Sequence, residues 1–387
     1  MILFFAPLAF LCLAYIAALL WLSRGLACAR RANLSERAAH DVQDLPAVTI
    51  IVCARNEEEN LHDLLPALAR QKYPTTKLEI ILVDDRSTDR TGELCRAFAA
   101  QYSHVRCFLI EDTLSDFAPK KRALDYAIRN AAGEIILLTD ADGIPGEYWA
   151  QEMAKPLRAG TAMACGYSPY FPRARFWQKI LALEYFSQAA VAAGSLGAGR
   201  PLTCTGSNLA YRRAAFFAVN GFEGIAQWIS GDDDLLLHKM HEQRAGKILY
   251  VAHPAAHVRV KPPASWKDLQ AQRTRYASKG RFYNWKVTLA LIAVYVLNLL
   301  LGLGLLAGFI GRFEIFAAAV LCGLLKAAFE FDYLRRAAAW FHEKELLRYF
   351  LLAALLHPFY IVYFSTRAQF ATFAWRGERF AARTHTK

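Results

Sequence analysis

The chain has 387 residues, of which 55% are hydrophobic and 21% are charged, and it carries a formal net charge of +12. This length exceeds one ordinary domain, and the composition indicates a soluble domain joined to membrane segments. We assign the basic charge to a membrane surface because no nucleic-acid motif accompanies it, and the eight cysteines form no CxxC pair that would indicate a disulfide framework or a zinc site.

The chain opens on an apolar run. Residues 2–22 contain no Asp, Glu, Lys or Arg, and about 20 apolar residues suffice to cross a bilayer. The basic residues Arg24, Arg30 and Arg31 follow the run instead of preceding it, which is the reverse of a signal peptide. We therefore predict an N-terminal transmembrane anchor over residues 1–23, with its C-terminal side in the cytosol.

Residues 45–260 have the pattern of an α/β domain. Apolar, β-branched runs at 47–53 and 78–83 predict buried strands, and each is followed by a turn and an amphipathic helix. A third strand is predicted at 105–112, and a further helix and strand lead to the segment TDADG. This alternation predicts an α/β fold with a doubly wound, mostly parallel sheet and flanking helices.

Carboxylates follow two of these strands. Asp84 and Asp85 come after the second strand, and Asp140 and Asp142 come after the later one. Ligands of doubly wound sheets bind outside the carboxyl ends of the strands. Two aspartates at i and i+2 offer oxygen ligands to Mg²⁺ or Mn²⁺, which would neutralise a leaving diphosphate. A solvated turn is the alternative, because turns also favour aspartate.

The C-terminal third alternates basic and apolar segments. We predict an amphipathic interface helix at 261–286 and transmembrane or re-entrant segments over 287–366. Within the latter, the run at 346–366 is interrupted by His357-Pro358, so we predict two short arms there. These arms would return a basic tail, residues 367–387, to the cytosolic face, as its arginines require.

Several segments, taken in order, resemble motifs of the membrane-anchored family 2 glycosyltransferases of the GT-A fold. This group includes cellulose, chitin and hyaluronan synthases and ceramide glucosyltransferase, and the resemblance covers roughly residues 45–285. The matching segments are VCARNEEENL, VDDRSTDRT, KKRALD, TDADG, TGSNLAYRR, ISGDDDLLL and QRTRY. Arg86, Asp125, Gly231 and Tyr276 stand where the family commonly has Gly, Asn, Glu and Trp.

The resemblance implies a UDP- or GDP-sugar donor, a lipid or polysaccharide acceptor, and Mg²⁺ or Mn²⁺ as cofactor. The residues implied for the donor nucleotide are Ala54, Asn56, Glu57, Asp84, Asp85, Lys120 and Asp140, and those implied for the metal are Asp140 and Asp142. The residues implied for the acceptor and diphosphate are Gly206, Ser207, Asn208, Gln272, Arg275 and Tyr276. The last three share one face of a predicted helix, where Arg275 and neighbouring Arg273 would add charge near the phosphates.

The catalytic base falls among the adjacent aspartates of ISGDDDLLL. If Ser230-Gly231-Asp232 corresponds to the Thr-Glu-Asp of the family, the base is Asp232. A shift of one residue makes it Asp233, and the sequence leaves both open.

The resulting hypothesis is an inverting, metal-dependent enzyme that transfers a sugar from a nucleotide-sugar donor to a lipid hydroxyl. It would be a multi-pass protein of the cell (inner) membrane with a cytosolic catalytic domain and no nucleic-acid partner. The alternatives are a processive polysaccharide synthase and a catalytically inactive nucleotide-sugar-binding scaffold. Few hydrophobic segments disfavour the synthase, and the intact acidic and Gln/Arg motifs disfavour the scaffold.

Overall fold

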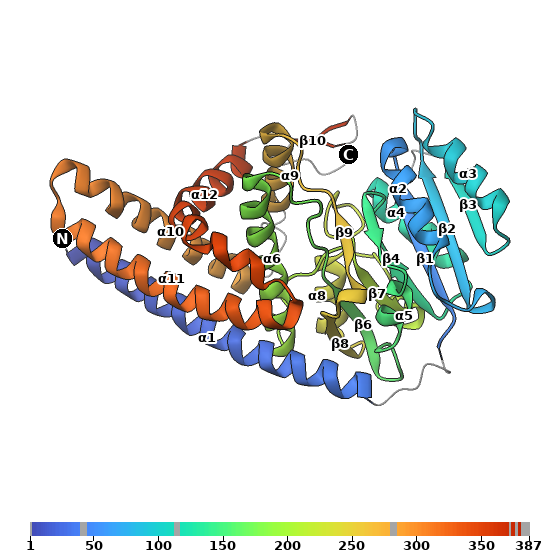
Figure 1. Ribbon diagram of the computed structural model, residues 1–387, viewed down its shortest axis with the longest axis horizontal. Coiled ribbons are helices and arrows are strands. Elements are labelled where there is room, and N and C mark those ends of the chain that lie inside the picture. Colours follow the sequence, from blue (N-terminus) through green and yellow to red (C-terminus); the bar gives the residue numbers. More distant parts are fainter. Residues whose placement is uncertain are drawn as a thin grey trace. The chain divides into compact units, whose positions relative to one another are not determined.

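The computed structural model describes residues 2–38, 45–111, 117–278, 285–370, 373–375 and 378–380. The chain divides into two compact units, and helices α1 and α6 contribute residues to both. We call residues 27–172 and 191–261 the sheet unit, and residues 1–26, 173–190 and 262–384 the helical unit. Figure 1 labels the elements of both.

The sheet unit contains a seven-stranded sheet with the order β3-β2-β1-β4-β7-β6-β8. Strand β7 is antiparallel to its neighbours β4 and β6, and the other pairs are parallel. The predicted mostly parallel sheet is therefore confirmed. Its strands are β1 (Val48–Ala54), β2 (Leu78–Asp85), β3 (Val105–Ile110), β4 (Ile135–Leu138), β6 (Thr161–Gly166), β7 (Leu209–Arg212) and β8 (Lys247–Val251).

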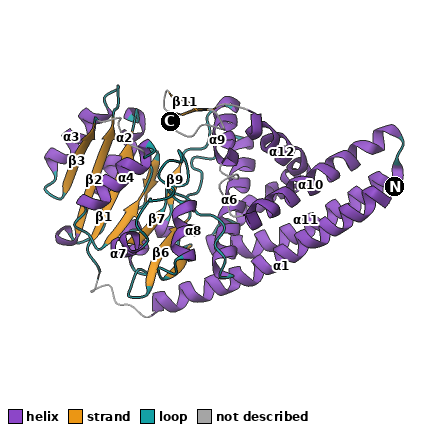
Figure 2. Ribbon diagram, turned by 180° about the vertical axis from the view of Figure 1, so that it is seen from behind, coloured by secondary structure: helices purple, strands orange, loops and turns teal. Residues whose placement is uncertain are grey.

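Helices cover both faces of this sheet (Figure 2). Alternate residues of β1 pack in one core cluster with apolar side chains of α2, α3 and α5, among them Leu61, Phe98 and Trp149. Helix α4 packs on β1 and β2, but its buried residues are not in that cluster, which places it on the opposite face. The helices of the unit are α2 (Glu58–Ala69), α3 (Thr91–Gln101), α4 (Pro119–Asn130), α5 (Trp149–Ala154), α7 (Arg213–Ala218) and α8 (Asp234–Glu242).

Short elements complete the sheet unit. Strands β5 (Gly143–Pro145) and β9 (Val258–Val260) pair antiparallel as a second, two-stranded sheet. This pairing fixes the turn after β4, because β5 begins directly behind Asp142. The 3-10 turns are η1 (Thr75–Lys77) and η2 (Pro254–Ala256).

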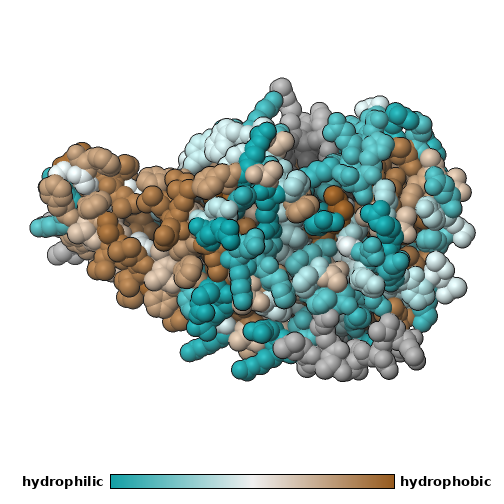
Figure 3. All heavy atoms as spheres, viewed as in Figure 1, coloured by the Kyte–Doolittle hydropathy of each residue, from teal (hydrophilic) through white to brown (hydrophobic). Residues whose placement is uncertain are grey.

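The helical unit consists of long apolar helices. It contains α9 (Trp266–Ser278), α10 (Trp285–Ala307), η4 (Gly308–Ile310), α11 (Phe313–Phe341), η5 (Lys344–Tyr349), α12 (Phe350–Phe370) and the hairpin β10 (Phe373–Trp375) and β11 (Glu378–Phe380), with parts of α1 (Ile2–Ala38) and α6 (Phe176–Gly197). Among the described residues, three segments are long and apolar enough to cross a membrane: Phe4–Asn33, Trp285–Ile310 and Lys344–Phe370. Figure 3 shows apolar residues gathered over α1, α10 and α11.

Helix α11 differs from these segments because it buries charge. Lys326 is 2% exposed; its Nζ lies 2.9 Å from Oε1 of Glu330 and 3.1 Å from Nδ1 of His357. The hydroxyl of Tyr15 donates to the same Glu330 oxygen at 2.6 Å. Charged groups between apolar helices are costly unless paired. This network pairs them and joins α1, α11 and α12.

Helix α12 does not follow the sequence prediction at its centre. Pro358 lies inside the helix, and the helical backbone continues from Phe350 to Phe370. The residues 346–366 therefore do not form two separate arms that break at His357-Pro358. Proline is tolerated within apolar helices where neighbouring helices satisfy the freed backbone group.

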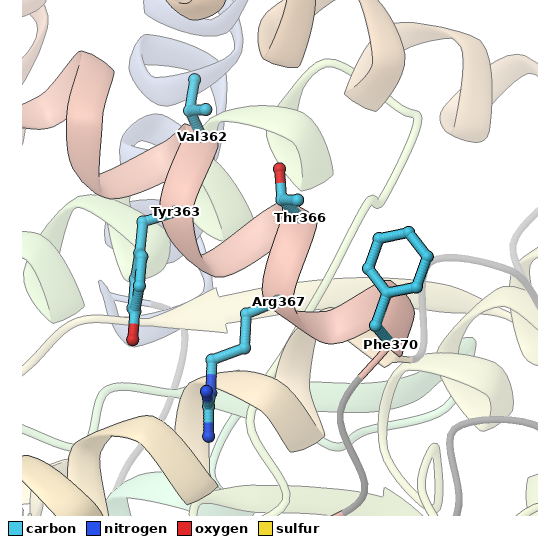
Figure 4. Close-up of a pocket in the computed structure, with 5 residues that line it drawn as sticks. All are labelled: Val362, Tyr363, Thr366, Arg367 and Phe370. Atoms are coloured by element: carbon cyan, nitrogen blue, oxygen red, sulfur yellow. The ribbon is translucent and has the colours of Figure 1, made fainter.

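The C-terminal half of α12 carries a shallow hollow of about 570 Å³ (Figure 4). It is lined by Val362, Tyr363, Thr366, Arg367 and Phe370, which recur at helical spacing along one face. Tyr363 also accepts a hydrogen bond from Nε2 of Gln270 at 2.6 Å. Exposed aromatic rings beside an arginine are typical of the interface between membrane and water.

Candidate active site

Three charged side chains from separate elements meet at the carboxyl end of the sheet. Nζ of Lys120, in the first turn of α4, lies 2.7 Å from Oδ1 of Asp140 and 2.8 Å from Oδ2 of Asp232. Asp140 follows β4, and Asp232 precedes α8. We call Lys120, Asp140 and Asp232 the carboxylate–lysine cluster. The structure thus brings together three residues that are 20 and 92 positions apart in sequence.

The two carboxylates control the charge of the lysine. Burial alone lowers the pKa of Lys120, but the attraction and hydrogen bonds of Asp140 and Asp232 raise this pKa well above its ordinary value. Lys120 is therefore a fixed cation at neutral pH. A fixed cation between two carboxylates can stabilise negative charge that develops beside it.

Asp232 and Asp233 have different surroundings. Oδ1 of Asp233 accepts the backbone N–H of Asp234 at 2.8 Å, as the cap of α8, and Oδ2 accepts the backbone N–H of Gly206 at 3.0 Å. Both carboxylate oxygens of Asp233 therefore accept hydrogen bonds from backbone N–H groups. Asp232, whose side chain is 10% exposed, pairs through its Oδ2 with Nζ of Lys120 instead. This difference favours Asp232 as the group that handles a proton.

Gly206 lies beside the carboxylate–lysine cluster. A methyl group at its Cα would lie 3.3 Å from Oδ2 of Asp232 and 3.5 Å from Nζ of Lys120. The sequence prediction that Gly206 belongs to the site is consistent with this position. The glycine leaves room beside the charged groups of Asp232 and Lys120.

We expect Gly206→Ala to lower activity by about tenfold to a hundredfold, because the added methyl group presses on Asp232 and Lys120 and a misplacement of functional groups by about 1 Å can cost a hundredfold. Steady-state kinetics of the purified chain will measure it. Gly146→Ala is the control, since a methyl there meets only the carbonyl oxygen of Ala255 at 3.7 Å. Equal rates for both variants would contradict a functional role for the space that Gly206 leaves beside Asp232 and Lys120.

Asp140 and Asp142 offer oxygen ligands at the exposed side of the cluster. The side chain of Asp140 is 38% exposed, and that of Asp142 is half-buried. The turn is tight, since the backbone N–H of Gly143 donates to the carbonyl oxygen of Asp140 at 2.9 Å. Among the described residues, no group of three or more His, Cys, Asp or Glu side chains is placed to hold a metal ion. Two carboxylates nevertheless fit Mg²⁺, which protein sites commonly bind through one or two carboxylates and substrate phosphates.

The end of β2 carries a second charged group. Oδ1 of Asp85 accepts Nε of Arg86 and Nη2 of Arg122, each at 3.0 Å. Arg86 has φ 57°, a left-handed conformation that is uncommon outside glycine. The neighbouring Asp84 orders the turn after β2, because its Oδ1 accepts a hydrogen bond from the backbone N–H of Ser87 at 3.1 Å.

Asn56 and Glu57, predicted to contact the nucleotide, join two loops. The backbone N–H of Asn56 donates to Oγ of Ser87 at 3.0 Å, and its side-chain oxygen accepts the backbone N–H of Thr88 at 2.8 Å. The backbone N–H of Glu57 donates to Oγ1 of Thr91 at 2.8 Å. Ala54 is 2% exposed at the end of β1. These contacts order the strand ends; a role in nucleotide binding stays a prediction.

Ser207 and Asn208 lie below the surface. Asn208 is fully buried: its oxygen accepts Nε1 of Trp149 at 2.9 Å, and its amide donates to the carbonyl oxygens of Tyr167 and Ala256 at 2.8 Å each. Ser207 is 4% exposed, and its hydroxyl donates to Oγ of Ser168 at 2.8 Å. In this structure Asn208 therefore supports the site from beneath and presents no surface to an acceptor.

We expect Asn208→Ala to lower the free energy of unfolding by about 3 kcal/mol or more, because three buried polar groups lose their partner. Denaturant titration of the purified chain, followed by tryptophan fluorescence, will measure it. Asn130→Ala is the matched control, since its amide donates only to the carbonyl oxygen of Tyr126 at an exposed helix end. A change below 1 kcal/mol for Asn208→Ala would contradict the structural role.

Gln272 and Tyr276 belong to α9 of the helical unit, where both are half-buried, and the side chain of Arg275 lies outside the described residues. Arg273, expected near the phosphates, is 4% exposed there and pairs with Glu184, and its Nε donates to the hydroxyl of Tyr360 at 2.7 Å. Arg273 therefore joins α9 to α6 and α12.

Two basic residues of KKRALD have roles that the motif did not indicate. Nζ of the fully buried Lys121 donates to the carbonyl oxygens of Trp228 and Ser230, at 2.6 and 2.9 Å, and so fixes the segment before Asp232. Arg122 holds Asp85. Three basic residues in one helical turn were the available signal, but their partners lie far away in the sequence.

Comparison with known families gives two matches. The model for glycosyl transferase family 2 matches residues 49–217, and the model for glycosyl transferase family group 2 matches residues 135–331, just over half of the chain. Both matched ranges include Asp140 and Gly206, and the second includes Asp232.

Curated relatives are distant. The probable glycosyltransferase YdaM of Bacillus subtilis is 25% identical over 249 residues, covering 62% of this chain and 57% of the relative. The beta-monoglucosyldiacylglycerol synthase of Synechocystis is 26% identical over 251 residues, covering 61% of this chain and 48% of the relative. The chain thus spans about half the length of these two relatives.

Among solved structures, the mannosyltransferase PcManGT from Pyrobaculum calidifontis, in complex with GDP-Man and Mn²⁺, aligns over 90% of this chain and 98% of its own. The sequence identity is 21% and the TM-score is 0.49. A likeness at this level does not establish a shared chemistry.

Proposed function

The chain belongs to glycosyl transferase family group 2, and from this premise we propose that it transfers one sugar from a nucleotide-sugar donor to the hydroxyl of a membrane lipid. The observation that carries the proposal is the carboxylate–lysine cluster at the carboxyl end of the sheet. It provides a carboxylate for the acceptor proton and a fixed cation near the leaving group.

The proposed reaction is a single displacement with inversion. Asp232 accepts the proton of the acceptor hydroxyl while that oxygen bonds to the anomeric carbon, and the bond from this carbon to the diphosphate oxygen breaks. Lys120 stabilises the departing diphosphate by its charge. Asp140 and Asp142 would hold Mg²⁺ or Mn²⁺, which neutralises phosphate charge when bound. Gly206 leaves space for the acceptor oxygen beside Asp232.

A lipid acceptor is supported by the apolar helices and by one relative. Three described segments are apolar enough to cross a membrane, and the hollow on α12 is bordered by aromatic side chains. The relative from Synechocystis is named as a synthase of a glucosyl lipid. A processive polysaccharide synthase is the second candidate.

A nucleotide-sugar panel tests the proposal. The purified chain in a nanodisc of bacterial lipids is incubated with UDP- and GDP-sugars, and the extracted lipids are analysed by mass spectrometry. We expect one hexose or N-acetylhexosamine mass added to a lipid. A ladder of many sugar masses would support the synthase instead, and unchanged lipids with every donor would contradict transfer to lipid.

We propose a multi-pass protein of the inner membrane with the sheet unit in the cytosol. The positive-inside bias then places the basic tail 367–387 on the cytosolic side. A single cysteine at position 385, which lies outside the described residues, should resist a membrane-impermeant thiol reagent in intact cells. Arg312→Cys, between α10 and α11, is the exposed control. Labelling at 385 without lysis would place the tail outside.

A further inference from the structure

We infer that Cys95 and Cys107 form a peroxide-responsive dithiol, in which a hydroperoxide oxidises Cys107 and Cys95 then closes a reversible disulfide. The inference goes beyond the proposed function, since the proposed sugar transfer uses neither thiol. It assigns a modification site to the edge strand of the seven-stranded sheet.

The two cysteines lie on consecutive elements that pack against each other. Cys95 is in the second turn of α3, and Cys107 is in β3, which forms one edge of the sheet. Helix α3 packs on β3, and Cys107 packs against the core cluster that includes Cys95. The thiol of Cys95 donates a hydrogen bond to the sulfur of Cys107. The two sulfur atoms are therefore in contact, which is a condition for a disulfide between them.

The two thiols have different reactivities. Cys107 is partly exposed, whereas Cys95 is 0% exposed. The hydrogen bond from Cys95 lowers the pKa of Cys107; burial opposes this, and the charge of Arg96 adds to the lowering. The same hydrogen bond, with burial, raises the pKa of Cys95. Because the thiolate is the form that attacks a peroxide, Cys107 is the thiol that is oxidised first, and Cys95 is the resolving thiol.

The chemistry runs in two balanced steps. The thiolate of Cys107 attacks one oxygen of the hydroperoxide and becomes a sulfenic acid; the O–O bond breaks, and the other oxygen leaves and takes up a proton from solvent. The sulfur of Cys95 then attacks the sulfenic sulfur, so that an S–S bond forms and the S–O bond breaks. The proton of Cys95 leaves with the hydroxide as water. The two thiols lose two electrons, which the hydroperoxide gains, and a dithiol reductant reverses the reaction by exchange.

A second thiol pair in the sheet unit provides an internal control. Cys204 donates a hydrogen bond to Cys165, and this bond raises the pKa of Cys204 well above its ordinary value. The accepting sulfur belongs to Cys165, which is 0% exposed. In this pair the partly exposed thiol is the protonated donor and the acceptor is buried. Contact between thiols is thus present without an accessible thiolate, and we expect this pair to stay reduced.

Hydrogen peroxide at low excess tests the inference on the full chain in detergent micelles. Free thiols are then blocked with N-ethylmaleimide, and the peptides are mapped by mass spectrometry. We expect a Cys95–Cys107 link that dithiothreitol reverses, formed at least about tenfold faster than any Cys165–Cys204 link. Cys95→Ala should accumulate the sulfenic acid at Cys107, trapped by dimedone, without a link. Cys107→Ser should leave Cys95 unmodified, with the melting temperature of each variant as the check on folding.

Three results would overturn the inference. The first is no Cys95–Cys107 link in the wild-type chain at peroxide concentrations that leave it folded. The second is equal formation of both links, which would mean that contact between thiols alone decides oxidation. The third is dimedone labelling of Cys95 in the Cys107→Ser variant, which would reverse the two roles. None of these measurements uses a sugar donor, so their failure leaves the proposed function intact.

Discussion

Asp232→Asn should lower sugar transfer by about a thousandfold or more while the donor nucleotide binds within a few fold of wild type. An amide cannot accept the acceptor proton, and general-base catalysis contributes about a hundredfold to ten-thousandfold in rate. The side chain is nearly isosteric and sits at a helix N-terminus, so the fold should persist. Transfer rate and nucleotide affinity are measured on the same preparation, with the melting temperature as the check on folding.

Asp233→Asn is the matched control for this prediction. The carboxylate of Asp233 bonds to the backbone N–H groups of Asp234 and Gly206, and an asparagine retains one acceptor oxygen for them. We expect this variant to lose some stability but to keep most of its turnover. A dead Asp233→Asn beside an active Asp232→Asn would move the base by one residue and contradict the assignment.

Asp142→Asn should lower turnover by about a hundredfold or more, and chelation with EDTA should abolish the activity of the wild-type chain. The reason is that removal of one charged ligand weakens the binding of the divalent cation, and this cation neutralises the leaving diphosphate. Mn²⁺ or Mg²⁺ added in excess should restore the chelated enzyme. The control is Asp63→Asn, an exposed carboxylate paired with Lys261 in the same unit. Full activity in EDTA would rule out the metal.

The sheet was predictable because its strands are continuous apolar runs in the sequence. The run 47–53 differs from β1 by one residue at each end, and the sheet buries both faces of that strand. The two acidic turns were predictable for the same reason, since aspartates stand out where a buried strand ends. The local sequence pattern was sufficient to predict an element wherever the burial of that element followed from its own residues.

The partners of the site residues were not predictable. The motif predicted that Asn208 contacts the acceptor. In the structure its side chain is instead hydrogen-bonded to three separate segments, at Trp149, Tyr167 and Ala256. Pro358 was predicted to interrupt the apolar segment, but helix α12 continues through it. Each outcome depends on packing between distant segments, which the spacing of residues along the chain does not encode.

The anomeric configuration of the product tests the central claim most directly. The claim is a single displacement in which Asp232 is the base, and a single displacement inverts the configuration at the anomeric carbon. NMR spectroscopy of the glycolipid formed from an α-linked nucleotide sugar should show a β linkage. An α linkage in that product would contradict the single displacement and the role assigned to Asp232.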